Sequence, residues 1–386
     1  IDYIIKKFSK RKVNKIKKDT LILLRIGIYL LYYSDTYPDY AVVNECVHFS
    51  RNQSKGFINA ILRKCSKAKN LSLQILEEMV DLSIKYSTSS LLIKNLGIFS
   101  PTPVENILTY LNEEPVFHLR MNTKDFSEKE IKDALLEEAV LFKELPLFTS
   151  LEVKGSGALL RKLLKEKKYF YFQNTASQLI SIIASLFSQQ SVLDGCAAPG
   201  TKSITLSLLK PEQRIFANDI NPTRIKLLKD FCEDFKINNI YPLSSDIKQP
   251  GVSGQFDLVI LDTPCTAAGT VRKNPDLKLK INSNMVEKNA KNQYEILLSA
   301  IKTFSNSYIL YSVCSFIKDE TEDILKATLD QPDPSLPTVK KINLSNILDR
   351  YNLKYKKTEH GFYLLPDQES NNDLFYISLL KCSKIK

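Results

Sequence analysis

Histidine is scarce in this sequence, with three in 386 residues, and the seven cysteines include no C-x-x-C pair. Zinc sites in proteins are built from closely spaced cysteine and histidine ligands. We therefore predict no metal site. An odd number of scattered thiols is typical of a protein in the reducing cytoplasm rather than of a disulfide framework, so a cytoplasmic location is expected.

Long apolar runs are also absent. The longest nearly apolar stretch, Leu21–Tyr33, carries Arg25 in its middle and is shorter than the roughly 20 residues that a membrane-spanning helix needs. We predict no transmembrane segment, no signal peptide and no membrane partner. A chain of this length with 44% hydrophobic and 25% charged residues is expected to form two or three globular domains.

Positive charge, by contrast, is in excess. Lysine and arginine number 54 against 43 acidic residues, a formal net charge of +11, and eight of the bases lie between Lys6 and Lys18. Such an excess favours a polyanionic partner, and a solvated helix face explains it equally well. Because the chain begins at Ile1, immediately before this basic stretch, we expect that its natural start has been truncated.

The first two regions of the chain differ in pattern. Residues 1–100 show apolar residues at helical spacing without strand-like alternation, which predicts an all-α domain. Pro101 and Pro103 mark a break. Residues 101–168 combine two predicted strands with a helix that a Ser127 and Glu130 capping pair would open. This pattern is typical of a small α/β connector. The predicted strands of the connector are residues 116–122 and 150–155.

Residues 169–386 change to a regular alternation. Strand-like and helix-like segments follow one another from residue 191 to residue 329, as in a doubly wound parallel sheet with helices on both faces. Two more strand candidates, residues 360–366 and 373–381, are expected to pair as an antiparallel edge. No internal repeat or low-complexity segment is evident.

The loop SVLDGCAAPGTKS, residues 191–203, follows the first strand, where such sheets approach nucleotides. A P-loop needs lysine directly after its last glycine, but Thr201 stands between Gly200 and Lys202, and Pro199 removes an amide donor. A dinucleotide loop needs two glycines where this turn has one. A site for S-adenosylmethionine (SAM) needs small residues here and acids at the strand ends. The sequence has both.

Three aspartates end successive predicted strands. We expect Asp194 to orient the loop or to meet the cofactor's amine, Asp219 to accept the ribose hydroxyls and Asp246 to accept the adenine amino group. Each acid alone is more often a solvated loop residue or a helix cap. Their recurrence at the strand ends favours the SAM interpretation.

Two cysteines follow the next two strands, Cys265 after Asp262 in LDTPC and Cys314 in YSVCSF. A single strand cysteine is usually a small core residue, but two that reach the same crevice beside an aspartate and a cofactor site favour chemistry. A thiolate that adds to C6 of a pyrimidine makes C5 nucleophilic toward the SAM methyl group. A carboxyl group at N3 supports the adduct, and a base then removes the C5 proton so that the thiol leaves.

Three segments carry a family resemblance: LDGCAAPGTK at 193–202, LDTPCTAAGTVRKNPDLK at 261–278 and YSVCSFIKDETED at 311–323. They resemble the motifs of bacterial RNA cytosine-5 methyltransferases of the RsmB/NOP family, in particular those that act on 16S ribosomal RNA. Residues 24–64 are similar to the NusB-like RNA-binding domain of that family. The resemblance implies a NusB-like all-α domain (1–100), a small α/β connector (101–168) and a Rossmann-like class I SAM methyltransferase domain (169–386).

The resemblance also implies roles for individual residues. It makes Cys314 the nucleophile, Cys265 the residue that assists release of the methylated base, and Asp262 the acid near the base. It places Arg272, Lys273 and Asn274 against the RNA backbone, although plain solvated surface explains them as well. The residues implied in cofactor binding are Cys196, Ala197, Ala198, Pro199, Gly200, Thr201, Lys202, Asp219, Asp246 and Asp262.

Some positions depart from the family pattern without touching either cysteine. Thr201 replaces a usual glycine, which requires a negative φ there. The other departures are Asn174, Thr263, Thr266 and the DLF sequence at Asp373. We expect a monomer that acts on 16S ribosomal RNA, free or in a partly assembled subunit. Three alternatives stay open: Cys265 as nucleophile, a related RNA or tRNA cytosine-5 methyltransferase, and a NusB-like RNA-binding factor with a non-catalytic methyltransferase scaffold.

Overall fold

The structure is a computed structural model, and it describes residues 1–99, 103–147, 149–155, 157–252, 254–330, 336–366 and 371–383. Contacts divide the chain into two compact units, Ile1–Thr88 and Ser89–Lys386. The predicted domain boundaries at residues 100 and 168 stay predictions, and Pro101 lies outside the described residues. Within the described ranges, every helix is too short or too polar to span a lipid bilayer.

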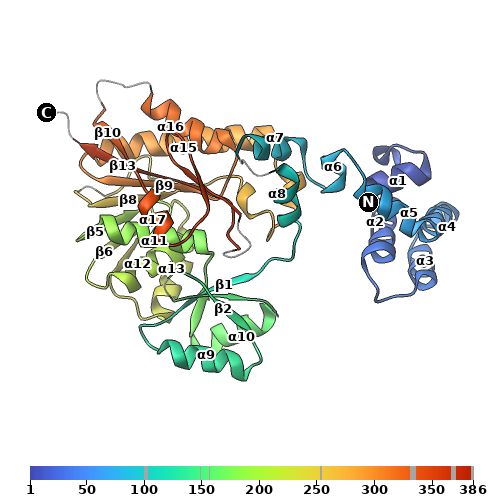
Figure 1. Cartoon of the computed structure of the whole chain (residues 1–386), viewed down its shortest axis with the longest axis horizontal. Coiled ribbons are helices and arrows are strands. Elements are labelled where there is room, and N and C mark those ends of the chain that lie inside the picture. The colour runs from blue at the N-terminus through green and yellow to red at the C-terminus, as the bar shows by residue number, and fades with distance from the viewer. Residues whose placement is uncertain are drawn as a thin grey trace. The chain divides into compact units, whose positions relative to one another are not determined.

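The first unit is helical, as predicted (Figure 1). Leu24, Ile28 and Leu31 are buried against Ile58 and Leu62 in its core, because apolar residues three and four positions apart share one face of a helix. Its elements are α1 (Asp2–Ser9), η1 (Val13–Lys15), α2 (Lys18–Tyr33), α3 (Asp39–His48), α4 (Asn52–Lys67), α5 (Lys69–Glu77) and α6 (Leu82–Lys85).

The second unit begins with two helices, α7 (Ser90–Phe99) and α8 (Val104–Tyr110), and continues with a small four-stranded antiparallel sheet. The sheet has the order β2 (Phe142–Glu144), β3 (Ser150–Val153), β1 (Phe117–Met121), β4 (Phe170–Phe172), and it packs with α9 (Glu128–Glu137) and α10 (Gly157–Lys167). The predicted strands β1 and β3 and the capping box of Ser127 and Glu130 are confirmed. Strands β2 and β4 were not predicted, because three residues are too few to show an alternating pattern.

The large sheet has nine strands in the order β11-β12-β13-β9-β8-β5-β6-β7, and β10 pairs with β13. Five neighbouring strands are parallel, as predicted: β5 (Ser191–Asp194), β6 (Arg214–Asn218), β7 (Ile240–Leu243), β8 (Leu258–Asp262) and β9 (Tyr308–Val313). The other four are antiparallel: β10 (Thr338–Ile342), β11 (Tyr355–Lys357), β12 (Phe362–Leu364) and β13 (Phe375–Ser383). The sheet is therefore mixed.

The expected antiparallel pairing of the last two strand candidates, now β12 and β13, is confirmed. Their expected place at the edge of the sheet is wrong for β13, which lies between β12 and β9 and also pairs with β10. The physical reason is burial: seven of the nine residues of this strand are buried and six are apolar, as for a strand in the middle of a sheet.

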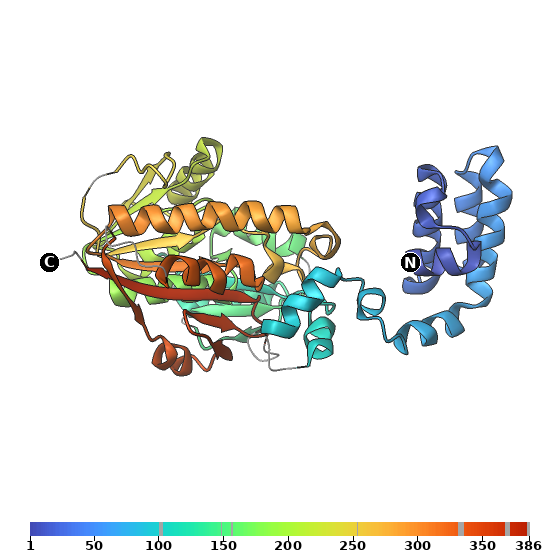
Figure 2. The same ribbon diagram turned by 90° about the horizontal axis from the view of Figure 1, so that it is seen from above.

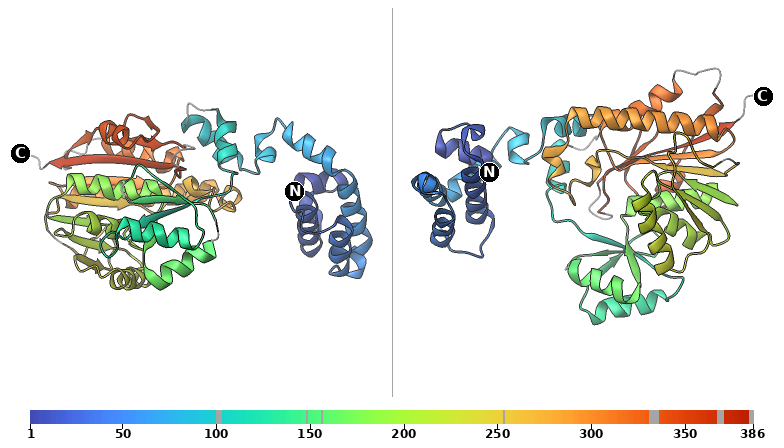
Figure 3. Two further views of the ribbon diagram at one scale, coloured as in Figure 1. Left: turned by 60° about the horizontal axis from the view of Figure 1, so that its bottom comes forward. Right: turned by 180° about the vertical axis from the view of Figure 1, so that it is seen from behind.

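Helices cover both faces of the large sheet (Figures 1 and 2). In Figure 1, α15 (Ser283–Thr303) and α16 (Glu322–Leu329) lie on one side of the strands. On the other side are α11 (Thr175–Phe187), α12 (Thr201–Leu209) and α13 (Pro222–Asp234). Figure 2 shows α15 running along the strands that it covers, and the right view of Figure 3 shows the same layers from behind. The remaining short helices are η2 (Ala268–Thr270), α14 (Leu277–Lys280), η3 (Lys318–Glu320) and α17 (Ser345–Arg350).

The strand order fixes where a ligand can enter. From β5 the sheet extends through β6 and β7 on one side, and β8 and β9 are added on the other. Strand order reverses between β5 and β8, and in open α/β sheets the crevice outside the carboxyl ends of the strands at such a point holds the ligand. The loops after β5, β6, β8 and β9 are therefore the place to look for a site.

We predict that Gly269→Ala destabilises the second unit. An added Cβ would lie 1.8 Å from the carbonyl oxygen of Leu374 and 3.0 Å from that of Cys314, and backbone atoms cannot move aside cheaply. We expect a loss of about 1–3 kcal/mol in the free energy of unfolding, measured by urea denaturation. Gly97→Ala is the control, because its Cβ would meet Val104 at an ordinary 3.7 Å. Equal stability of the two variants would contradict the prediction.

Candidate active site

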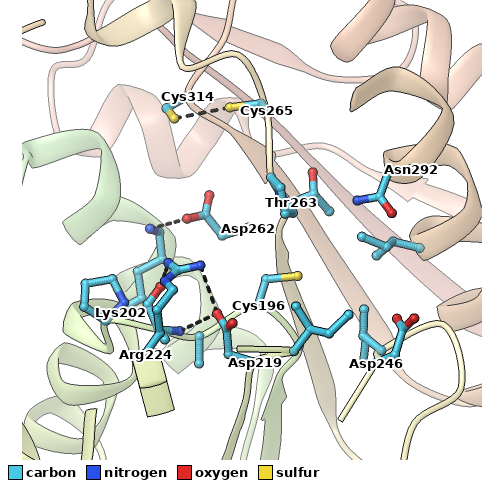
Figure 4. Close-up of a pocket in the computed structure, with 18 of the residues that line it drawn as sticks. Cys196, Lys202, Asp219, Arg224, Asp246, Asp262, Thr263, Cys265, Asn292 and Cys314 are labelled. Atoms are coloured by element: carbon cyan, nitrogen blue, oxygen red, sulfur yellow. Dashed lines mark hydrogen bonds and ion pairs between the residues drawn. The ribbon is translucent and has the colours of Figure 1, made fainter. Parts of the chain in front are cut away.

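A cavity of about 300 Å³ lies at the carboxyl ends of the parallel strands. It is the place that the strand order indicates, and Figure 4 shows the side chains around it. Its lining residues are Gly195, Cys196, Ala197, Ala198, Pro199, Thr201, Lys202, Asp219, Ile220, Arg224, Asp246, Ile247, Lys248, Asp262, Thr263, Pro264, Cys265, Ala267, Asn292, Ile296 and Cys314.

The loop between β5 and α12 forms one wall of the cavity. Its only described residue with a left-handed backbone is Gly200, at φ 110°, and a Cβ there would lie 2.8 Å from Leu228. Glycine is therefore needed at this position for both its conformation and its small size. Thr201 is the first residue of α12 and its φ is not positive. A negative φ is what the sequence required of a residue with a Cβ at this position.

Asp194 organises this loop from beneath. The side chain is fully buried, it does not line the cavity, and its Oδ2 accepts a hydrogen bond from Ser203 Oγ at 2.7 Å. Burial raises the pKa of Asp194 to about 6, because an ion loses hydration in the protein interior. Of the two roles expected for Asp194, its contacts favour orienting the loop over meeting a ligand.

Asp219 lines the cavity and also holds the loop. Its Oδ2 accepts a hydrogen bond from the backbone N–H of Ala198 at 3.2 Å, and its Oδ1 accepts one from Asn221 N–H at 2.9 Å. Arg224 Nη1 lies 3.3 Å from the same Oδ2, and this guanidinium also donates to the carbonyl of Ala198. The arginine and the carboxylate thus tie the end of β6 to the loop after β5.

Lys202 and Asp262 form an ion pair on the wall shared by β5 and β8. Lys202 Nζ lies 2.5 Å from Asp262 Oδ2, and Ser312 Oγ donates to Asp262 Oδ1 at 3.0 Å. Burial opposes the charge of Lys202, but the neighbouring Asp262 carboxylate outweighs it and raises the lysine pKa. Lys202 therefore stays protonated in the wall of the cavity.

The part of the cavity formed by the loops after β6 and β7 combines apolar side chains with carboxylates. Ile220 and Ile247 each follow a strand-end aspartate, Asp219 and Asp246 respectively, and both line the cavity. Asp246 Oδ1 accepts a hydrogen bond from Lys248 N–H at 3.0 Å and is partly exposed. This part of the lining thus offers two apolar side chains beside two carboxylates.

The two predicted thiols meet in the wall of the same cavity, where Figure 4 shows their side chains pointing toward each other. Cys265 Sγ and Cys314 Sγ are 3.3 Å apart. The register of the parallel pair β8 and β9 sets Asp262 opposite Ser312, so the two chains leave the sheet side by side. Cys265 follows three residues after Asp262, and Cys314 follows two residues after Ser312.

The surroundings of the cysteines in the cavity differ. The hydrogen bond with Cys314, together with burial, raises the pKa of the Cys265 thiol well above its usual range. Burial also raises the pKa of Cys196, which lines the opposite wall. Both thiols are therefore held neutral. Cys314 lines the cavity together with Lys202.

The three residues expected against RNA lie after β8. Arg272 is 8% exposed, its Nη2 donates to the carbonyl of Glu114 and its Nη1 to Asn371, both at 2.8 Å, and it stacks on Tyr110 at 4.4 Å. Its guanidinium is thus used within the protein, which does not favour a contact with phosphate.

The two residues after Arg272 are more accessible. Lys273 pairs with Asp373 at 2.9 Å, and Asn274 is exposed and donates to Thr270. Their role toward RNA stays a prediction.

Sequence reasoning missed several residues of the site: Arg224, Lys248 and Asn292 in the lining, and Glu320 behind the cysteines. Arg224 had a local signal, since it lies in the first turn of the helix that follows Asp219. Asn292 had none, because it is one of several polar residues in the middle of α15, and only the folded chain shows which of them faces the cavity.

Among the described residues, one group brings three possible metal ligands within 4.8 Å of one another: Asp330, Glu359 and His360. The two acids are exposed, and exposed acidic groups often gather without a metal ion. None of the three lines the cavity. The prediction that the chain has no metal site stays a prediction.

Two parts of the chain match known protein families. Residues 182–381 match the family described as 16S rRNA methyltransferase RsmB/F, and residues 1–67 match the NusB family. A probable ribosomal RNA small subunit methyltransferase B of Coxiella burnetii is 29% identical over 94% of this chain and 84% of its own length. The ribosomal RNA small subunit methyltransferase B of Salmonella agona is 25% identical over 99% of this chain and 86% of its own length.

Solved structures share the fold. The crystal structure of PH0851 superposes with a TM-score of 0.77 at 24% identity, over 98% of this chain and 86% of that one. The structure of NSun6 from Pyrococcus horikoshii with SFG gives a TM-score of 0.59 at 17% identity, over 77% of this chain and 99% of that one. The predicted fold class, a NusB-like helical segment followed by a Rossmann-like methyltransferase domain, is confirmed. The chain belongs to the RsmB/F family of 16S rRNA methyltransferases, which are SAM-dependent enzymes.

Proposed function

We propose that this protein methylates C5 of a cytosine in 16S ribosomal RNA through a covalent bond between Cys314 Sγ and C6 of the base. One observation carries the proposal: the sulfur atoms of Cys265 and Cys314 lie 3.3 Å apart in the wall of a cavity that the strand-end acids also line. A structural pair of core cysteines would not need to face such a cavity.

The donor set fits SAM. The carboxylates of Asp219 and Asp246 stand beside Ile220 and Ile247 in the lining, which suits an adenosine that offers ribose hydroxyls, an amino group and a flat ring. The small residues before Gly200 allow the backbone to approach the rest of the molecule. When bound, SAM supplies an electrophilic methyl group. The chain's own residues must then make the pyrimidine nucleophilic.

Cys314 is the better nucleophile of the two thiols. A thiolate rather than a thiol adds to C6, and Cys314 lines the cavity together with Lys202, whose ammonium would favour a thiolate there. Asp262 anchors that ammonium, and its place on the strand that leads to Cys265 suits a carboxyl group that faces the base. Once C5 carries the methyl group, a base removes the C5 proton and the Cys314 thiolate leaves.

Cys265 suits the role of assisting release. Its raised pKa keeps the proton on sulfur, so its S–H can donate a hydrogen bond to the Cys314 sulfur as that atom takes back its charge. Stabilising a leaving group in this way lowers the barrier to its departure. Without Cys265, the bond between Cys314 and the base should form and persist.

RNA binding is proposed to use the basic character of the chain. The formal net charge is +11, and residues 1–67 match the NusB family. A base that is stacked or paired would have to be extruded to reach Cys314. We further propose that the protein acts as a monomer in the cytoplasm, where its seven free cysteines would stay reduced.

Two cysteine variants test the mechanism. Cys314→Ala should reduce methyl transfer to 16S ribosomal RNA by about 10³-fold or more, because the covalent step is lost. Cys265→Ala should also lose turnover but should accumulate a protein–RNA adduct that survives denaturing electrophoresis. Methyl transfer is measured with radiolabelled SAM, and the adduct by its reduced mobility.

The outcomes separate the open alternatives. An adduct in Cys314→Ala instead of Cys265→Ala would assign the nucleophile to Cys265. Methylation of tRNA but not of 16S ribosomal RNA by the wild type would make the protein a related tRNA cytosine-5 methyltransferase. A wild-type protein that binds RNA but not SAM would be the non-catalytic scaffold. Cys382→Ala is a matched control, since this buried cysteine is in β13 and does not line the cavity.

A third variant tests the cofactor site without RNA. Asp219→Asn should weaken SAM binding about 10- to 100-fold, because a charged acceptor that holds the loop is lost. Isothermal titration with SAM gives the dissociation constant. Asp234→Asn is the control, since this carboxylate pairs with Lys168 on the surface of the same unit. Unchanged affinity in Asp219→Asn would remove Asp219 from the cofactor site.

A further inference from the structure

Glu320 is a buried acid behind the two cysteines that the mechanism above does not use. The residue is 0% exposed and ends η3, just after the Cys314 loop. It does not line the cavity. Taking a carboxylate out of water is costly unless its oxygens find hydrogen-bond donors. The donors to the Glu320 carboxylate therefore indicate the role of this residue.

The Glu320 carboxylate binds both cysteine loops at once. Its Oε1 accepts the backbone N–H of Thr266 at 2.7 Å, and its Oε2 accepts Thr266 Oγ1 and Ser315 Oγ, each at 2.6 Å. Thr266 directly follows Cys265, and Ser315 directly follows Cys314. Charge-assisted hydrogen bonds of this length are among the stronger ones in proteins.

The backbone around Glu320 strengthens the same connection. Its carbonyl accepts a hydrogen bond from Tyr311 Oη at 2.9 Å, and Tyr311 lies on β9, the strand that leads to Cys314. Gly269 N–H donates to the carbonyl of Cys314 at 2.9 Å, which links the two loops on a second side. The carboxylate is nevertheless the only described group that binds a residue adjacent to each cysteine.

We propose that Glu320 is a positioning residue that ties the Cys265 loop to the Cys314 loop and thereby sets the separation and orientation of the two sulfur atoms in the cavity. The inference rests on the proposed function, because only that function requires a particular distance between the sulfur atoms of Cys265 and Cys314. Glu320 touches neither sulfur in the structure and acts through Thr266 and Ser315.

The proposal has an electrostatic consequence that can be measured. After the hydrogen bond with Cys314 and burial, the Glu320 charge is among the causes that raise the pKa of Cys265. The other titratable groups near the Glu320 carboxylate are Cys265, Cys314 and Tyr311. Burial also raises the pKa of Glu320 itself. Removing the Glu320 charge should therefore lower the pKa of Cys265.

The test uses the full-length protein with Glu320→Gln, Glu320→Ala and the control Asp319→Asn, whose acid is adjacent and exposed. Glutamine keeps the size of the side chain and can still accept from Thr266 N–H. We expect kcat for methyl transfer to fall about 10-fold in Glu320→Gln and about 100-fold in Glu320→Ala. The affinity for SAM should stay within twofold, because Glu320 does not contact the cofactor loop. Asp319→Asn should match the wild type.

A second measurement does not depend on methyl transfer. In a Cys314→Ser background, alkylation of Cys265 by iodoacetamide is followed against pH by peptide mass spectrometry. Glu320→Gln should shift this profile to lower pH, and Asp319→Asn should not. If Glu320→Ala does not fold, Thr266→Val and Ser315→Ala each remove one side of the connection, and each should lower kcat with unchanged SAM affinity.

The outcomes are distinguishable. Wild-type kcat in Glu320→Ala, a fall in SAM affinity parallel to that in kcat, or an unchanged Cys265 profile in Glu320→Gln would overturn the assignment of Glu320. If the wild type itself methylates no cytosine, the proposed function fails, while the alkylation profile still decides whether Glu320 controls Cys265.

Discussion

The parallel pairing of β8 with β9 is the constraint on which the rest of the site depends. Parallel neighbours end at the same edge of a sheet, and the register of Asp262 opposite Ser312 brings the two following loops together. A shift by one residue would turn alternate side chains to the other face of the sheet and would separate Cys265 from Cys314. Backbone hydrogen bonds thus bring together the two loops in which the sulfur atoms lie 3.3 Å apart.

Acids in the site divide into those that hold loops and those that remain available. Asp194 is buried beneath the cofactor loop, Asp219 is buried against it but still lines the cavity, and Glu320 is buried behind the cysteines. Each accepts hydrogen bonds from backbone or hydroxyl groups. Asp246 and Asp262 are more exposed and face the cavity. Burial of a carboxylate is costly unless it accepts hydrogen bonds, so these acids hold the groups that donate to them, and the more exposed ones keep capacity for a ligand.

Lys202 is one of three basic residues that line the cavity, with Arg224 and Lys248. Lys202 follows the loop directly and reaches Asp262 on the neighbouring strand, so one side chain connects the cofactor wall with the strand that leads to Cys265. The Lys202 ammonium is therefore held in place by the same ion pair that joins these two walls. Such an arrangement keeps the electrostatic field of the site fixed before substrate arrives.

The amino-acid sequence by itself indicated the helical first unit, the five parallel strands with the helices between them, the small-residue loop and the two thiols that follow β8 and β9, because these depend on local patterns and short motifs. Tertiary structure alone decided that β13 lies inside the sheet, that Asn292 faces the cavity, and that Glu320 joins the two cysteine loops. It also decided that Arg272 is buried, since its guanidinium binds Glu114, which is 158 residues away in the chain. Contacts between residues so distant in sequence leave no local pattern, and only packing brings them together.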